Sequence, residues 1–136
     1  MEAVNKMPTI LIAEDEEDLR EMYTRALEAR GFEVLGAENG KEVIDILDRS
    51  AATVDLLLLD IVMPQMDGFE VLEKISKRTD IGHIPIIVST NLDNEDDRRE
   101  ALSLGAADYF VKSRHTPMEL ADEVRRVLEQ HRPMVA

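Results

Sequence analysis

Short apolar runs alternate with segments of helical spacing along this chain, and this alternation restricts the fold more than any other feature. The runs are TILIA (9–13), FEVLGA (32–37), VDLLLLD (54–60), IPIIVST (84–90) and DYFV (108–111). Five strands alternating with five helices form βαβ units, which build a parallel sheet with right-handed crossovers and helices on both faces. We therefore expect an α/β fold of the flavodoxin-like (βα)5 type, a doubly wound parallel sheet with strand order 2-1-3-4-5.

The run LLLLD at residues 56–60 has four leucines with no polar alternation. This pattern fits a strand that is buried on both faces, as in a parallel sheet covered by helices. Asp60 lies where that strand emerges, and taken alone it could simply begin a loop.

The helices have recognisable faces and starts. A core face of the first helix is predicted from Leu19, Met22, Tyr23, Ala26 and Leu27, and Gly31 ends that helix. The last helix has Leu120, Val124, Val127 and Leu128 on one face. Capping boxes are predicted for Asn39 with Glu42, Asp67 with Glu70, and Thr116 with Glu119, the last with Pro117 at the first helical position.

Length and charge limit the function classes. The 136 residues suit one domain spanning 1–136, with a core of about 8–131 and short flexible tails. A formal charge of -13 would repel a nucleic-acid backbone, so we expect no direct nucleic-acid binding. The chain has no cysteine for a disulfide, and we expect neither a signal peptide nor a membrane span, which fits a cytoplasmic protein.

Polar residues follow four of the predicted strands. They are Glu14 and Asp15 after the first, Asp60 after the third, Thr90 at the end of the fourth and Lys112 after the fifth. In open α/β sheets, ligands bind beyond the carboxyl ends of the strands, where the strand order reverses. We therefore expect three carboxylates, a hydroxyl and an ammonium to converge on one edge of the sheet.

The carboxylates predict a divalent cation. Two carboxylates about 4 Å apart repel by roughly 4 kcal/mol at an effective dielectric of about 20. Oxygen ligands without His or Cys favour Mg²⁺, for which Mn²⁺ can substitute. Asp60 is the best candidate for a nucleophile toward a phosphoryl group, because it ends the central buried strand.

The pair Glu14-Asp15, the block LLLLDIVMPQMDG (56–68), the IPIIVST strand and DYFVK together resemble the response-regulator receiver domains of two-component signalling. The resemblance covers essentially the whole chain. The intervals of thirty residues from Asp60 to Thr90 and twenty-two from Thr90 to Lys112 are also similar to the spacing of that family.

The resemblance implies a role for each site residue. Asp60 would be phosphorylated by a histidine kinase or a phosphotransfer protein, and Mg²⁺ would be held by Glu14, Asp15, Asp60 and the backbone carbonyl of Val62. Lys112 would pair with the acyl phosphate, Thr90 would turn inward to hydrogen-bond it, and Tyr109 would be the aromatic switch that moves with the threonine. Alone, each of these residues has an ordinary structural explanation, such as an acid favoured at a helix start.

The resemblance also implies a response to phosphorylation. The altered surface would comprise the fourth helix, the fifth strand and the fifth helix, the face that receivers use for a downstream protein partner. Whether phosphorylation drives the formation of a homodimer stays open. So do the cognate kinase and the output.

The sequence departs from the family pattern at three places. Ser113 follows Lys112 where many receivers have a cis proline, so this peptide is open to a trans bond and the reach of Lys112 is in question. Asn91 follows Thr90 where the family prefers a small residue. Val62 and Leu92 occupy the two positions that influence hydrolysis in the family, and since neither can orient a water we predict slow autodephosphorylation.

Three functions compete. The leading hypothesis is a stand-alone phosphoacceptor switch, not an enzyme beyond its own phosphorylation and slow dephosphorylation, although the chain could also be a domain from a longer protein. A Mg²⁺-dependent aspartyl phosphohydrolase would usually carry a second acid two residues after the first, where Val62 stands. The third is a phosphorylation-independent binding module of receiver fold. We assign no role to His83, His115 or His131.

Overall fold

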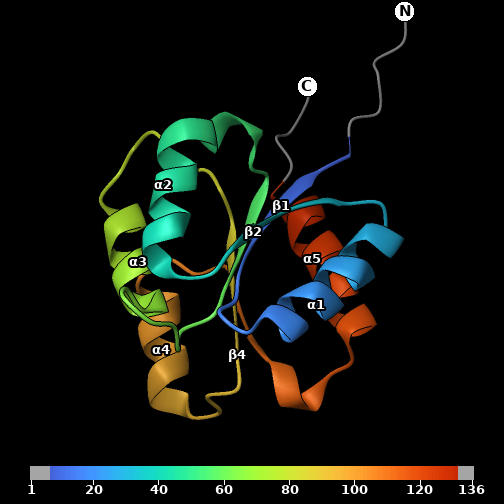
Figure 1. Ribbon diagram of the computed structural model, residues 1–136. Coiled ribbons are helices and arrows are strands. Elements are labelled where there is room, and N and C mark those ends of the chain that lie inside the picture. The colour runs from blue at the N-terminus through green and yellow to red at the C-terminus, as the bar shows by residue number, and fades with distance from the viewer. Residues whose placement is uncertain (1–6, 132–136) are drawn as a thin grey trace, which may run out of the picture.

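The computed structural model describes residues 7–131, which form a five-stranded parallel sheet with helices on both faces (Figure 1). The strands are β1 (Thr9–Ala13), β2 (Glu33–Ala37), β3 (Leu56–Leu59), β4 (Ile86–Thr90) and β5 (Asp108–Val111). Their order is β2-β1-β3-β4-β5, and every neighbouring pair is parallel. The predicted fold class and strand order are confirmed. The predicted flexible tails lie largely outside the described residues.

Five α-helices follow the strands in turn. They are α1 (Glu17–Ala29), α2 (Gly40–Ser50), α3 (Gly68–Ser76), α4 (Glu95–Ser103) and α5 (Pro117–Gln130). Two short 3-10 turns, η1 (Ala51–Thr53) and η2 (Lys112–Arg114), precede β3 and α5. No helix within residues 7–131 is long and apolar enough to cross a membrane.

The sheet separates two apolar layers. Helices α1 and α5 cover one face, and α2, α3 and α4 cover the other (Figure 1). The four leucines of β3 alternate between these layers, with Leu57 and Leu59 in one and Leu56 and Leu58 in the other. All four are at most 1% exposed, which explains the absence of polar alternation in this strand.

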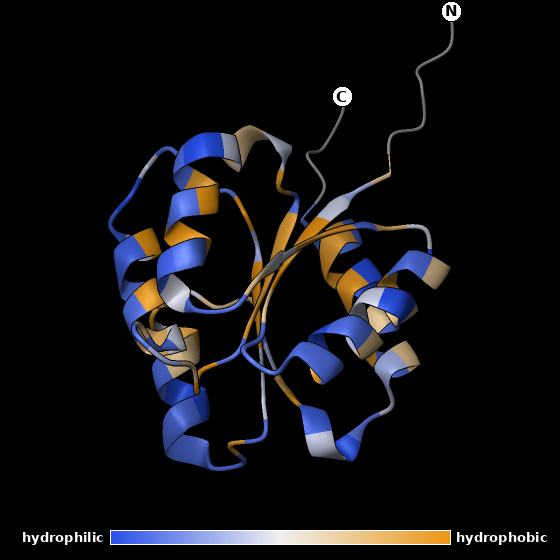
Figure 2. Ribbon diagram, viewed as in Figure 1, coloured by the Kyte–Doolittle hydropathy of each residue, from blue (hydrophilic) through white to orange (hydrophobic). Residues whose placement is uncertain are grey.

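The hydrophobic residues of the helices lie mainly on the sides that face the sheet, and hydrophilic residues lie mainly on the outer sides (Figure 2). In α1, the side chains of Tyr23, Ala26 and Leu27 are buried as predicted. Met22 is 41% exposed, so its assignment to the core was wrong. Met22 lies at the edge of the apolar stripe of α1, and a residue at that edge is partly turned toward solvent.

The helix caps agree with the sequence except in one detail. Reciprocal capping boxes are present at Asp67 with Glu70 and at Thr116 with Glu119. Asn39 accepts a hydrogen bond from the Glu42 N–H, but the Glu42 carboxylate accepts from the N–H of Glu38 rather than that of Asn39. Of the two hydrogen bonds predicted for the capping box of Asn39 with Glu42, only the one accepted by Asn39 is therefore confirmed.

Candidate functional site

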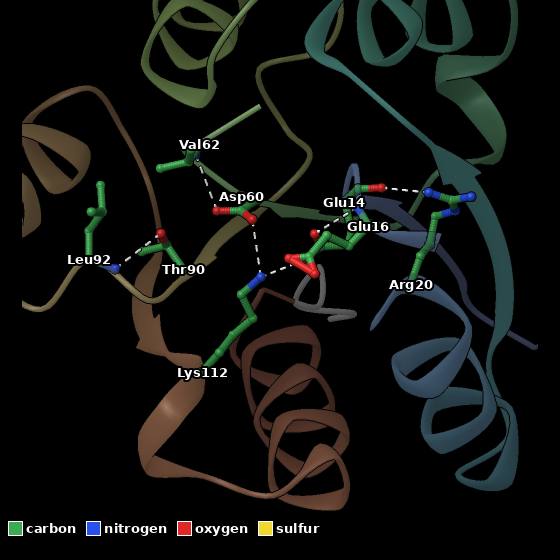
Figure 3. Close-up of polar contacts among 8 residues, drawn as sticks. All are labelled: Glu14, Glu16, Arg20, Asp60, Val62, Thr90, Leu92 and Lys112. Carbon is green, nitrogen blue, oxygen red and sulfur yellow. Dashed lines mark hydrogen bonds and ion pairs between the residues drawn. The ribbon is translucent and has the colours of Figure 1, made fainter. Parts of the chain in front are cut away.

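The carboxyl ends of the strands bring together polar side chains from distant parts of the sequence (Figure 3). Glu14 and Asp15 follow β1, Asp60 follows β3 and Lys112 follows β5. These four of the five predicted groups meet, whereas the fifth, the hydroxyl of Thr90, accepts a hydrogen bond from Leu92 in the loop after β4. Glu14, Asp60 and Lys112 are all less than 10% exposed, whereas Asp15 is exposed.

Lys112 connects two of the carboxylates. Its Nζ atom lies 2.5 Å from Oε1 of Glu14 and 3.1 Å from Oδ2 of Asp60. Burial alone would lower the pKa of Lys112, but the Asp60 and Glu14 carboxylates outweigh this effect and raise it. The ammonium therefore stays charged at neutral pH.

Glu14 is held at several atoms. Its N–H donates to the carbonyl of Ala37 at 3.0 Å, and its Oε2 accepts from the N–H of Glu16 at 3.2 Å. Burial raises the pKa of Glu14, although its contact with Lys112 acts in the opposite direction. This carboxylate is thus fixed in place at the inner side of the site.

The donor set suits a hard divalent cation. Glu14, Asp15 and Asp60 each offer a carboxylate oxygen, and these oxygens all lie within 4.8 Å of one another. Asp15 is at the exposed side, where an ion could reach the site from solvent. Oxygen ligands in this arrangement fit Mg²⁺ or Mn²⁺.

Asp60 also accepts a hydrogen bond from its own loop. The N–H of Val62 donates to Oδ1 of Asp60 at 3.3 Å, while Lys112 contacts Oδ2. Both oxygens of the carboxylate are therefore oriented. The predicted use of the Val62 carbonyl as a ligand stays a prediction, and Val62 as a residue is 60% exposed.

Thr90 and Tyr109 are connected through the loop that follows β4. Thr90 is 1% exposed, and its Oγ1 accepts from the N–H of Leu92 at 3.3 Å. The Tyr109 hydroxyl donates to the carbonyl of Leu92 at 2.6 Å. Burial, together with the carboxylates of Asp97 and Asp93, raises the pKa of Tyr109 to about 12. Thr90 and Tyr109, the two residues predicted to form the switch, thus both hydrogen-bond to the backbone of Leu92.

The departures from the family pattern have simple structural outcomes. The Lys112–Ser113 peptide is trans, and Lys112 nonetheless contacts both Glu14 and Asp60. The doubt about the reach of Lys112 is thereby removed. Asn91 is exposed at the start of the loop after β4.

Three further contacts at this edge were not predicted. Arg20 donates from Nη1 to the backbone carbonyl of Glu14 at 2.7 Å. Arg114 pairs with Asp93 at 2.5 Å and so joins the loops after β5 and β4. Gly68 packs so closely on the end of β3 that a Cβ atom there would lie 2.4 Å from the carbonyl oxygen of Asp60. Of these three contacts, only that of Gly68 had a signal in the sequence, namely the glycine itself.

Residues 10–125 match the family model described as the response regulator receiver domain. Among curated relatives, a probable transcriptional regulator ycf27 of Galdieria sulphuraria is 37% identical over 130 residues, covering 96% of this chain and 49% of the relative. The phosphate regulon transcriptional regulatory protein PhoB of Pseudomonas aeruginosa is 38% identical over 126 residues, covering 92% of this chain and 53% of the relative. The chain thus spans about half the length of the curated relatives it matches.

Solved structures similar to this chain are also response regulators or receiver domains. The chemotaxis response regulator CheY4 of Vibrio cholerae has a TM-score of 0.82 at 26% identity, covering 90% of this chain and 99% of that one. The receiver domain of a signal transduction histidine kinase from Syntrophus aciditrophicus has a TM-score of 0.83 at 29% identity, covering 95% and 96%.

Proposed function

This chain belongs to the response regulator receiver family, and on that basis we propose that it is a phosphoacceptor switch in which Asp60 receives a phosphoryl group from a phosphorylated histidine. The observation that carries the proposal is the position of Lys112, whose ammonium contacts the buried carboxylates of Glu14 and Asp60 at once. An ammonium in this position is suited to bind an oxygen of a phosphoryl group on Asp60.

In the proposed reaction, a carboxylate oxygen of Asp60 attacks the phosphorus of phosphohistidine. The new O–P bond forms as the P–N bond breaks, and the imidazole nitrogen leaves with the bonding electron pair and takes up a proton from solvent. Lys112 then exchanges its contact with the Asp60 carboxylate for one with a phosphoryl oxygen. Because its pKa is raised, Lys112 remains a cation throughout.

Glu14, Asp15, Asp60 and the Val62 carbonyl would hold Mg²⁺, for which Mn²⁺ can substitute. When bound, the ion neutralises negative charge on the phosphoryl oxygens and on the carboxylates around them. The site combines three carboxylates, those of Glu14, Asp15 and Asp60, with one ammonium, that of Lys112. Negative charge is therefore in excess, and a divalent ion would offset it.

We propose that phosphorylation acts on the loop after β4. The acyl phosphate brings about two negative charges and strong acceptors beside Thr90. Thr90 then turns its hydroxyl from Leu92 toward the phosphoryl group, and Tyr109, which also holds Leu92, moves with it. The altered face comprises α4, β5 and α5, and a downstream protein binds there.

The partners and setting follow from the same proposal. A histidine kinase or phosphotransfer protein supplies the phosphoryl group, in the cytoplasm, where the regulators of transcription that this chain resembles would act. The described chain would act through protein contacts, because its formal charge of -13 opposes direct contact with nucleic acid. We propose a single receiver domain over residues 1–136, without further catalysis beyond its own phosphorylation and slow dephosphorylation.

The test is the intact mass of the chain after incubation with acetyl phosphate and Mg²⁺. We expect one phosphoryl adduct that is lost in Asp60→Asn and when the ion is chelated. Asp67→Asn is the matched control, because Asn caps a helix as well as Asp, and it should still form the adduct. An adduct that persists in Asp60→Asn would contradict the assignment of the acceptor.

The same variants separate the competing functions. A phosphorylation-independent binding module would form no adduct and would keep its partner contacts in Asp60→Asn. A phosphohydrolase would release inorganic phosphate over many turnovers instead of accumulating the adduct. Partner binding through α4, β5 and α5 would appear as changes in the amide chemical shifts of that face on phosphorylation.

A further inference from the structure

Arg20 is the fourth residue of α1, about one turn into the helix, and its side chain reaches back toward the end of β1 (Figure 3). Its Nη1 donates to the backbone carbonyl of Glu14 at 2.7 Å. The donor is a charged group, and charge-assisted hydrogen bonds are stronger than neutral ones. Glu14 is six residues before Arg20, more than the three or four that separate neighbours on a helix. The hydrogen bond therefore connects α1 to the loop that precedes it.

The carbonyl of Glu14 belongs to the peptide that joins Glu14 to Asp15. The sheet holds the other side of Glu14, because its N–H donates to Ala37. Beyond that bond the chain leaves the sheet, and α1 begins only at Glu17. Arg20 therefore fixes the plane of the peptide from which Asp15, the exposed carboxylate of the cluster, departs.

The path of the Arg20 side chain depends on a glycine in the edge strand. A Cβ atom on Gly36 would lie 3.2 Å from Cδ of Arg20 and 3.5 Å from its Nε. Gly36 is exposed and its φ is not in the left-handed region, so backbone conformation does not require glycine at this position. The absent side chain leaves room for the arginine instead.

We propose that Arg20 is a positioning residue for the divalent-cation site, and that Gly36 is the residue that lets it reach that position. The inference rests on the proposed function, because it assumes that Glu14, Asp15 and Asp60 hold the ion. Arg20 touches neither the ion nor the phosphoryl group. It orients the peptide between Glu14 and Asp15, and thereby the carboxylate of Asp15.

Electrostatics alone predicts the opposite result, which makes the inference testable. A guanidinium near a cation site repels the cation, so removing its charge should tighten binding if charge were its main effect. Loss of a group that orients a ligand weakens metal binding, typically by about 10-fold to 100-fold. The direction of the change in affinity therefore decides between the two roles.

The experiment measures the Kd for Mn²⁺ from the EPR signal of the free ion, without any phosphoryl donor. We expect the Kd to rise about tenfold in Arg20→Met, which keeps the apolar stem. Arg20→Lys keeps the charge and a donor and should recover part of the loss. Arg25→Met is the control, since Arg25 is an exposed residue of α1 that pairs with Glu21, and its Kd should equal that of the wild type.

Gly36→Val provides the independent variant. Valine favours a strand, so this change supports the fold while it displaces the side chain of Arg20. The Kd for Mn²⁺ should rise with Arg20 still present. Folding of every variant is checked by the midpoint of urea unfolding in the absence of the ion.

The outcomes separate this inference from the proposed function. Binding in the wild type that is lost in Asp15→Asn, with an unchanged or lower Kd in Arg20→Met and Gly36→Val, would overturn the role of Arg20 alone. Wild-type binding that Asp15→Asn does not weaken would overturn the cation site and the role of Arg20 with it.

Discussion

The Nζ atom of Lys112 lies 3.1 Å from Oδ2 of Asp60, although their strands, β5 and β3, are separated by β4. Two strand spacings amount to roughly 10 Å, a distance that only a long side chain can cross. The four methylene groups of the lysine cross the end of β4, so the ammonium reaches the acidic cluster while its own backbone stays at the edge strand. Burial of the lysine follows from this path.

We expect Lys112→Met to lower the free energy of unfolding by about 3 kcal/mol in the absence of Mg²⁺, because Glu14 and Asp60 lose their buried cationic partner. Mg²⁺ should then stabilise this variant more than it stabilises the wild type, since the ion can replace the lost positive charge. Urea unfolding with and without Mg²⁺ measures both effects. Lys74→Met, at an exposed position of α3, should behave as the wild type does. If Mg²⁺ stabilised Lys112→Met and the wild type equally, the ion and the Lys112 ammonium would not share the acidic site.

Gly68→Ala should disturb the end of β3. The new methyl group would lie 2.4 Å from the carbonyl oxygen of Asp60 and 2.7 Å from Cα of Ile61, so the backbone must move. We expect a loss of about 2 kcal/mol in unfolding free energy, and slower phosphorylation of Asp60. Gly82→Ala is a milder control, because its Cβ would meet the carbonyl of Arg78 at 3.2 Å. Unaltered stability and phosphorylation in Gly68→Ala would show that the loop relaxes freely.

The predictable part of this structure is the part that periodicity and strand ends encode. All five strands, their order and the meeting of Glu14, Asp15, Asp60 and Lys112 follow from buried apolar runs and from the edge at which parallel strands end. The assignment of Met22 to the core failed because a helical stripe does not reveal how far the sheet extends beneath its edge.

The unpredicted contacts have another physical character. Arg20 and Arg114 are long side chains whose partners depend on the path of a loop, and hydropathy patterns carry no information about that path. Arg114 in particular pairs with Asp93, twenty-one residues away, across two loops that become neighbours only after the sheet has formed. Gly68 is visible in the sequence as the last residue of the block LLLLDIVMPQMDG, but its close approach to Asp60 appears only in the folded structure.

The ion pair of Arg114 with Asp93 should restrain the loop after β4. Both side chains are largely exposed, at 64% and 45%, so we expect Arg114→Ala to change unfolding free energy by less than about 1 kcal/mol. Hydrogen exchange of the amides at 91–93 should nevertheless become faster, because the loop loses one of its ties. Arg99→Ala, on the exposed face of α4, should leave those amides unchanged. Unchanged exchange in Arg114→Ala would mean that the Tyr109 hydroxyl bond is sufficient to hold the loop.

Val62→Asn should shorten the lifetime of the phosphorylated state. Val62 is 60% exposed and its backbone N–H donates to Asp60, so an amide side chain at this position could orient an attacking water. We expect hydrolysis about tenfold faster than in the wild type, whose lifetime should exceed seconds. Loss of the phosphoryl adduct is followed by intact mass after removal of the donor. Leu35→Asn, on the exposed part of the edge strand β2, should not alter the rate.

Asp108 at the start of β5 supplies a pH-dependent part of the stability. Burial, followed by the neighbouring Glu123 carboxyl, raises the pKa of Asp108 from 3.8 to about 6. Arg126 lies 3.5 Å from Asp108, but its Nε donates to Glu123 at 2.8 Å, and this contact lowers the pKa of Glu123 to about 2. Arg126 thus stabilises the charged form of Glu123, and Asp108 retains its proton to a higher pH.

The sign of the effect follows from proton binding. Between about pH 4 and pH 6 the folded chain holds the Asp108 proton more tightly than the unfolded chain does, so this residue makes stability fall as pH rises. Asp108→Asn stays neutral and can still donate to Glu123. We therefore expect the advantage of Asp108→Asn over the wild type in unfolding free energy to be larger at pH 7.5 than at pH 4.5 by about 1 kcal/mol, measured by urea unfolding. Asp45→Asn, at an exposed position of α2, should show no such dependence on pH. A difference between Asp108→Asn and the wild type that is the same at both pH values would rule out titration of Asp108 as its cause.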